Sequence, residues 1–227
     1  MAHEHLANYL TFTLQSFKNP NYLAIEQFCV KTLWHYPFYM SIELLQSSLA
    51  TAQSVLKNVE QDQLALSTPC TDWNVRELIN HFLGVQWYFH ANAMSTPLDL
   101  TKLLPADCTI DDCIAALSDV SQANINAYSA EGIMEKLMPY ALGELPGRDC
   151  ARVAAHDLFI HTWDLAKATG QDTNLNPQLA TTLFASIREG FPDSIRGDEG
   201  KWYKFEQTVG NESSVADEYA AFCGRQI

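Results

Sequence analysis

Basic residues are scarce in this sequence, and long apolar runs are missing. The 227 residues include 14 Lys and Arg against 27 Asp and Glu, so the formal net charge is −13. With no local basic cluster to offset it, this charge argues against a nucleic-acid backbone as a partner. No apolar run approaches the roughly 20 residues of a membrane span, and the start, MAHEHLANYL, lacks the basic residues and apolar core of a secretory signal. We therefore expect a cytoplasmic protein that contacts neither membranes nor nucleic acids.

The six cysteines form no CxxC motif, and the sequence has no internal repeat or low-complexity tract. A chain of this length, with 47% hydrophobic residues, can bury one sizeable core without a disulfide framework. We expect reduced and mostly buried cysteines, and one main domain that spans residues 37–227.

Residues 1–36 differ from the rest of the chain. They carry two short amphipathic helical patterns that are rich in aromatic residues and separated by Asn19-Pro20, where proline breaks the helix. So much aromatic surface must cover something. We expect a helical N-terminal extension that packs on the main domain or joins two subunits into a homodimer.

The main domain shows helical periodicity with almost no convincing strand pattern. One helix has a clear start, because Asn74 is a natural N-cap and Glu77 completes a capping box. His81 lies on the flank of the buried stripe of that helix. The pattern predicts an all-α four-helix bundle, up-and-down or crossed-over, with a helix after Asn176 and a short C-terminal helical tail. The expected long helices cover residues 38–59, 75 onward, 109–132 and 150–169, and residues 133–149 are expected to form a loop.

The segment CARVAAHDLFIHTWDLAKATG, residues 150–170, is the most informative of these helices. We expect Asp149 as its N-cap and Gly170 as the glycine that ends it. Asp157 and His161 are four residues apart on one face, so their side chains lie within ~6 Å and can bind one metal ion. For an isolated pair, the alternative is an ordinary ion pair or hydrogen bond on a helix surface.

Two stretches resemble the signatures of a known family. LSTPCTDWNVRELINHFLG and GELPGRDCARVAAHDLFIHTWDLAKATGQD are similar to motifs of the actinobacterial-type, metal-binding branch of the DinB-like bundles, which is related to mycothiol-dependent maleylpyruvate isomerase. The resemblance covers residues 42–170 and extends more faintly to the FCGR segment. It implies a DinB-like bundle in which His81, Asp157 and His161 hold one divalent metal. The isomerase has glutamate in place of Asp157, so the carboxylate here has ~1.5 Å less reach.

Two imidazoles and one carboxylate leave one open position on a tetrahedral metal, which is typical of a catalytic site. Zinc is the first expectation, with nickel, manganese or iron as alternatives. Asp164 can accept a hydrogen bond from an imidazole, or it can simply hold the helix to a loop. Cys70 is interpreted as a small buried hydrophobe rather than a nucleophile.

Several functions suit this set of ligands. The first is a metal-dependent enzyme that uses a low-molecular-weight thiol, held as thiolate, in an S-transfer or a maleylpyruvate-isomerase-like cis–trans isomerisation of a small-molecule substrate. Arg148, Arg152 and Arg225 are the candidate cations for an anionic substrate. The alternatives are a metal-dependent hydrolase and a non-catalytic metal-binding stress or interaction module. An iron oxygenase also fits the ligands, but no cosubstrate motif accompanies them.

Overall fold

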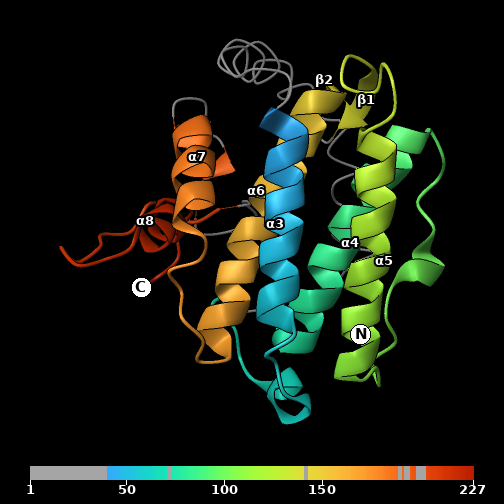
Figure 1. Ribbon diagram of the computed structural model, residues 1–227. Coiled ribbons are helices and arrows are strands. Elements are labelled where there is room, and N and C mark those ends of the chain that lie inside the picture. Colours follow the sequence, from blue (N-terminus) through green and yellow to red (C-terminus); the bar gives the residue numbers. More distant parts are fainter. Residues whose placement is uncertain (1–39, 71–72, 141–142, 189–190, 192–194, 198–202) are drawn as a thin grey trace.

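The computed structural model describes residues 40–70, 73–140, 143–188, 191, 195–197 and 203–227 (Figure 1). The extension expected at residues 1–36 lies outside the described residues. Four long helices make up the main body, which confirms the predicted four-helix, DinB-like bundle. They are α3 (Met40–Leu56), α4 (Val75–Met94), α5 (Ile110–Tyr128) and α6 (Gly147–Ala168). None of the helices in the described part of the chain is long and apolar enough to cross a membrane.

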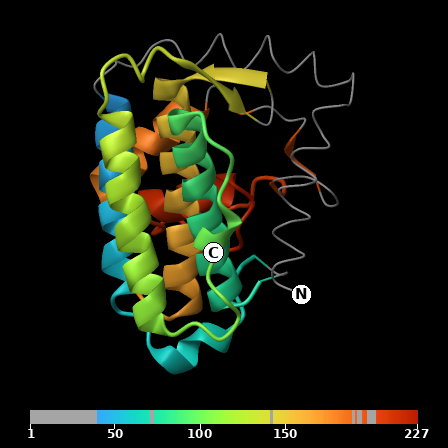
Figure 2. The same ribbon diagram turned by 90° about the vertical axis from the view of Figure 1, so that its right-hand side faces the viewer.

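The bundle is crossed-over. Helix α6 packs against both α3 and α4, and α5 packs against the same two helices from the opposite corner. Figure 2 shows that the segment of residues 95–109, which connects α4 to α5 and includes the short 3-10 helix η4 (Leu100–Lys102), runs back alongside α4. Asn80 on α4 holds this segment, because its side chain accepts from Leu104 N–H and donates to Leu104 C=O at 3.0 and 3.1 Å. Because the segment of residues 95–109 returns along the bundle before α5 begins, α4 and α5 point in the same direction.

Local signals in the sequence place several helix ends correctly. The capping box of Asn74 and Glu77 begins α4 as predicted, after the 3-10 helix η3 (Gln61–Ala65). Gly170 has a φ of +70° and follows the last residues of α6, and the next residue, Gln171, donates its N–H to Ala166 C=O at 2.9 Å. This left-handed glycine turn satisfies the last carbonyls of the helix.

The region predicted as a loop, residues 133–149, contains an antiparallel hairpin, which corrects the sequence interpretation. Its strands are β1 (Leu137–Tyr140) and β2 (Gly143–Pro146), the only sheet within the described residues. The side chain of Met138 on β1 is buried in the core, opposite Leu145 on β2. Each strand has only four residues and contains a proline. The alternation of apolar and polar residues that identifies a strand is therefore too short to recognise in the sequence.

The start of α6 also differs from the prediction. The helix begins at Gly147 rather than Cys150, and Asp149 lies inside it, where it pairs with Arg152. The N–H groups of Gly147 and Arg148 donate to carbonyls of the preceding segment, so they need no side-chain cap. A Cβ at Gly147 would lie 2.0 Å from Ile133 O, so only glycine allows this close approach.

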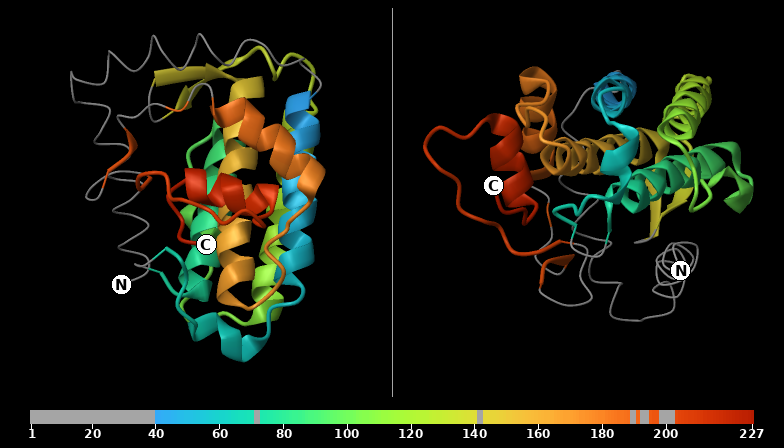
Figure 3. Two further views of the ribbon diagram at one scale, coloured as in Figure 1. Left: turned by 90° about the vertical axis from the view of Figure 1, so that its left-hand side faces the viewer. Right: turned by 90° about the horizontal axis from the view of Figure 1, so that it is seen from below.

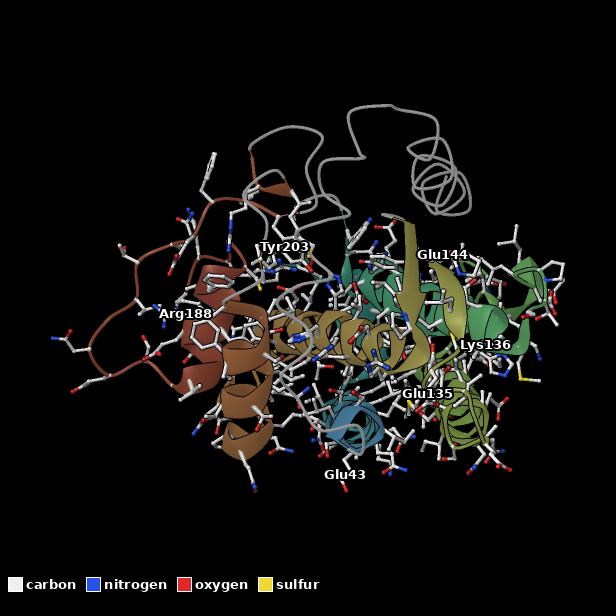
Figure 4. The ribbon with its side chains drawn as sticks, turned by 90° about the horizontal axis from the view of Figure 1, so that it is seen from above. Glu43, Glu135, Lys136, Glu144, Arg188 and Tyr203 are labelled. Carbon is white, nitrogen blue, oxygen red and sulfur yellow. The ribbon has the colours of Figure 1, made fainter. Side chains whose placement is uncertain are left out.

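Helix α6 is the central element of the core. Most of its residues are buried, and Trp163 is among the largest side chains that are fully enclosed. Gln86 on α4 donates to Ala154 C=O on α6 at 3.0 Å and accepts from Asn124 of α5 at 3.3 Å. These buried hydrogen bonds fix the relative positions of three helices. Charged side chains such as Glu43 and Arg188 lie outside, exposed to solvent (Figure 4).

Two shorter helices, α7 (Pro177–Arg188) and α8 (Val215–Phe222), pack together, and α8 lies crosswise on α6 (Figure 3). Both begin where the sequence predicts them, at the caps Asn176 and Ser214. Trp163 donates its indole N–H to Asp217 of α8 at 2.9 Å. The C-terminal tail is thereby fixed to the helix that carries Asp157 and His161.

Candidate metal centre

The three residues predicted as metal ligands lie together between α4 and α6. His81 comes from α4, and Asp157 and His161 come from adjacent turns of α6. Their potential ligand atoms all lie within 4.8 Å of one another. His161 Nε2 is 3.7 Å from Asp157 Oδ1, and the two imidazole rings have centroids 4.7 Å apart. The contact of α4 with α6 thus joins residues that are 80 positions apart in the sequence.

An indole ring covers one side of this trio. Trp73, the residue before the cap of α4, stacks on His81 with ring centroids 4.2 Å apart and tilts toward His161 at 5.9 Å. His81 and His161 are buried, with exposed fractions of 3% and 8%. Polar groups in such a site are poorly screened, so their charges act strongly on one another.

A buried carboxylate orients His161. His161 Nδ1 donates to Asp164 Oδ2 at 3.0 Å, and Asp164 has no exposed surface. Arg225 holds the same carboxylate with two bonds, Nε to Oδ1 at 3.1 Å and Nη2 to Oδ2 at 2.8 Å. With Nδ1 engaged by Asp164, Nε2 is the nitrogen that faces Asp157, and it can bind a metal ion once its own proton leaves. Asp164 thus has the orienting role considered from the sequence, and Arg225 is the partner that sequence analysis did not connect with it.

The turn after α8 brings Arg225 to this site. Gly224 has a φ of +88°, and Arg225 donates its N–H to Ala220 C=O at 3.0 Å, as in a glycine-terminated helix. A Cβ at Gly224 would lie 2.8 Å from Lys204 O. Gly224 in the FCGR segment therefore allows a tight turn, and this turn directs the side chain of Arg225 back to α6.

Cys70 adds a thiol to the cluster. It packs against the core as expected, but it is only partly buried, and its Sγ donates to Asp164 Oδ2 at 3.2 Å. The same sulfur lies 3.9 Å from His161 Nδ1 and 3.6 Å from Arg225 Nη2. The loop is fixed by Thr68, whose hydroxyl donates to Cys70 C=O at 2.9 Å. The sequence analysis, which interpreted Cys70 as a small buried hydrophobe, did not predict this placement.

Without a metal, the imidazolium of His161 supplies the positive charge beside Asp157. Burial disfavours the imidazolium of His161, but the Asp157 charge and the hydrogen bond with Asp164 outweigh it and raise the pKa to about 10. Burial, His161 and Arg225 lower the pKa of His81 well below its usual value. His81 is therefore neutral, the form that binds metals. Burial raises the pKa of Asp157, against the charges of His161 and Arg225.

One carboxylate oxygen of Asp157 indicates whether a metal ion suits these residues. Asp157 Oδ2 is buried and accepts no hydrogen bond from the described residues. Leaving a buried acceptor without a partner costs about 1–3 kcal/mol, and a bound cation would remove that cost. Two imidazole nitrogens and one carboxylate oxygen are the donors that zinc and similar divalent ions bind. The residues therefore fit a divalent metal.

Other candidates have structural roles. His156 bonds the hydroxyl of Tyr219 through Nδ1 and Ser186 Oγ through Nε2, so both ring nitrogens are engaged away from the trio. Glu77 caps α4 as expected. Arg152 pairs with Asp149, and Arg225 contacts the carboxylate of Asp164 beside the trio.

Comparison with known proteins gives one family. The model of the mycothiol maleylpyruvate isomerase N-terminal domain matches residues 45–166. Uncharacterized proteins from two strains of Mycobacterium tuberculosis are each 33% identical over 174 residues, which is 77% of this chain and 91% of the relative. A crystal structure of the mycothiol-dependent maleylpyruvate isomerase shares the fold, with a TM-score of 0.55 and 16% identity over 69% of this chain and 71% of that chain. A histidine-to-alanine mutant of that enzyme gives a TM-score of 0.56 and 15% identity, over 74% and 76%. The chain therefore belongs to the family of the mycothiol maleylpyruvate isomerase N-terminal domain.

Proposed function

We propose that this protein is a divalent-metal-dependent enzyme that uses a low-molecular-weight thiol, in an S-transfer or an isomerisation of the maleylpyruvate type. The observation that carries the proposal is the convergence of His81, Asp157 and His161, whose potential ligand atoms lie within 4.8 Å of one another. The buried Oδ2 of Asp157, which accepts no hydrogen bond from the described residues, supports it. Membership of a mycothiol-linked family supports the thiol. The donor set favours zinc, with nickel, manganese and iron as alternatives.

Each side chain has a distinct task in this proposal. His81 coordinates as a neutral imidazole and loses no proton when it does so. His161 would hold the metal through Nε2, which must first release its own proton, because Asp164 keeps the proton on Nδ1. When bound, a divalent cation supplies positive charge that lowers the pKa of a thiol and favours the thiolate at neutral pH. Trp73 covers the two imidazoles and limits the access of water.

Arg225 serves the ligands rather than the substrate in this scheme. Its Nε and Nη2 groups donate to Asp164, and Nη1 donates to Cys223 C=O at 3.1 Å. Burial opposes the ionisation of Asp164, but the guanidinium outweighs it and keeps the pKa of that carboxyl below its usual range. An ionised Asp164 is what fixes the tautomer of His161. Arg225 is therefore a positioning residue.

The first experiment tests metal binding without reference to activity. Full-length protein is stripped with a chelator and titrated calorimetrically with zinc, nickel and manganese, with circular dichroism to confirm folding. We expect one equivalent in the wild type and none in His81→Ala. His90→Ala is the matched control, because His90 lies on the same helix and makes an edge-to-face contact with Trp87 instead. Undiminished binding in His81→Ala would contradict the proposal.

A second experiment separates the thiol enzyme from a hydrolase. Cobalt-loaded protein is mixed with mycothiol or with S-methylated mycothiol, and the visible spectrum of the cobalt is recorded. We expect a spectral change with the free thiol only. Turnover is then measured with maleylpyruvate, other electrophiles and a panel of esters and amides. Hydrolysis without any thiol effect would favour the hydrolase and overturn the thiol assignment.

A further inference from the structure

The imidazole of His161 separates two groups of potential ligands. Its Nε2 faces Asp157 and the first trio, whereas its Nδ1 faces a different pair, the Cys70 thiol and the Asp164 carboxylate. The potential ligand atoms of Cys70, His161 and Asp164 also lie within 4.8 Å of one another. Thiolate, imidazole and carboxylate are a donor set that binds zinc and other thiophilic ions. The second group therefore has the composition of a metal site in its own right.

A cationic side chain already lies in that second group. Arg225 Nη2 is 2.8 Å from Asp164 Oδ2 and 3.6 Å from Cys70 Sγ, so one guanidinium contacts two of the three potential ligands. It supplies the positive charge that the buried carboxylate needs. A metal ion at the same place would be repelled by the guanidinium and would have to displace it. A metal ion and the Arg225 guanidinium therefore compete for this place.

We propose that Cys70, His161 and Asp164 form a second, thiophilic metal site, and that Arg225 is the resident cation that keeps metal out of it. The arginine follows the Gly224 turn and is 11% exposed, so it can leave toward solvent when its bonds to Asp164 and to Cys223 C=O break. The inference goes beyond the proposed function, because neither Cys70 nor Asp164 belongs to the first trio.

The chemistry of the second site is balanced in protons and charge. A divalent ion that enters brings two positive charges and two protons leave, so the charge of the ligand group is unchanged, while the Arg225 guanidinium moves out toward solvent. Cys70 must release its thiol proton, because thiolate is the form that binds metal. His161 Nδ1 must release its proton as well, since that proton now points at Asp164. With a metal already on Nε2, His161 would then link the two ions as an imidazolate. Soft ions such as cadmium, zinc and cobalt suit a thiolate, whereas manganese and magnesium prefer oxygen.

The test measures the number of metal ions bound and whether the Cys70 sulfur binds one of them. Chelator-stripped full-length protein is titrated with cobalt, and the thiolate-to-cobalt charge-transfer absorption is recorded together with the number of equivalents. We expect one equivalent and no thiolate band in the wild type and in Arg225→Lys, which keeps the cation. Arg225→Gln should bind a second equivalent and gain the band. Cys70→Ser in the Arg225→Gln background should lose both.

Two further measurements make the result decisive. His81→Ala combined with Arg225→Gln should keep the thiolate band, which shows that the second site stands even if the first trio binds nothing. In the wild type, excess cadmium should displace the arginine and give a sulfur-to-cadmium absorption that Cys70→Ser lacks, a result that does not depend on the folding of Arg225 variants. A single equivalent without a band in folded Arg225→Gln would overturn the proposal. So would equal cadmium spectra for the wild type and Cys70→Ser.

Discussion

Substitution of Asp164 by asparagine tests how much the orientation of His161 contributes to metal binding, because it leaves His161 itself in place. Asp164→Asn keeps the size of the side chain but removes the charge that accepts from His161 at 3.0 Å and from Arg225 at 2.8 and 3.1 Å. Loss of such a supporting carboxylate typically costs about 10–100-fold in metal affinity, or ~1.4–2.7 kcal/mol. The variant should also lose about 1–3 kcal/mol of stability, because the buried guanidinium keeps only part of its pairing.

The assay is a competition titration in which the protein and a chelator of known affinity share limiting zinc, with chemical denaturation in parallel. Asp112→Asn is the matched control. It makes the same chemical change at an exposed carboxylate that caps α5 through Thr109. We expect unchanged zinc affinity in that control. Unchanged zinc affinity in folded Asp164→Asn, or an equal loss in Asp112→Asn, would refute the orienting role of Asp164.

Further predictions concern the ligand, the C-terminal turn and the N-terminal extension. Asp157→Glu should retain metal binding because it keeps the charge and adds ~1.5 Å of reach, whereas Asp157→Asn should bind less tightly in the same titration. Gly224→Ala should lower stability by about 1–3 kcal/mol and weaken zinc binding, since the new Cβ would meet Lys204 backbone at 2.8 Å. Gly132→Ala, which has a similar φ and open space around it, should change stability alone. Removal of residues 1–36 should lower thermal stability or change the mass in solution; a soluble, equally stable protein of unchanged assembly would contradict a packing role for that segment.

The parts of the fold that could be predicted depend on residues close together in the sequence. The capping box of Asn74 and Glu77 and the terminal Gly170 involve contacts within one or two helical turns, so their chemistry is visible in a short window. Asp157 and His161 are four residues apart, and helix geometry alone places them on one face. His81 could be added only through the resemblance to a family, because its partners lie on another helix.

What could not be predicted depends on distant contacts. The start of α6 is set by Gly147 packing on Ile133 O, so tertiary packing, rather than a capping side chain, decides the boundary. Arg225 reaches Asp164 across 61 positions, and Cys70 reaches it across 94. No periodicity in the sequence records such approaches. They follow from the docking of α8 on α6 and from the loop that precedes α4.

The proposed function requires a metal ion between α4 and α6. The most direct measurement is a calorimetric titration of zinc into chelator-stripped wild-type protein and into His161→Ala, with circular dichroism of both. Two remaining ligands are too few for a stable site, and the core, rather than the metal, should maintain the fold. We predict one equivalent in the wild type, none in His161→Ala, and helical spectra that match. Equal affinity in both proteins would place the metal elsewhere and contradict the account.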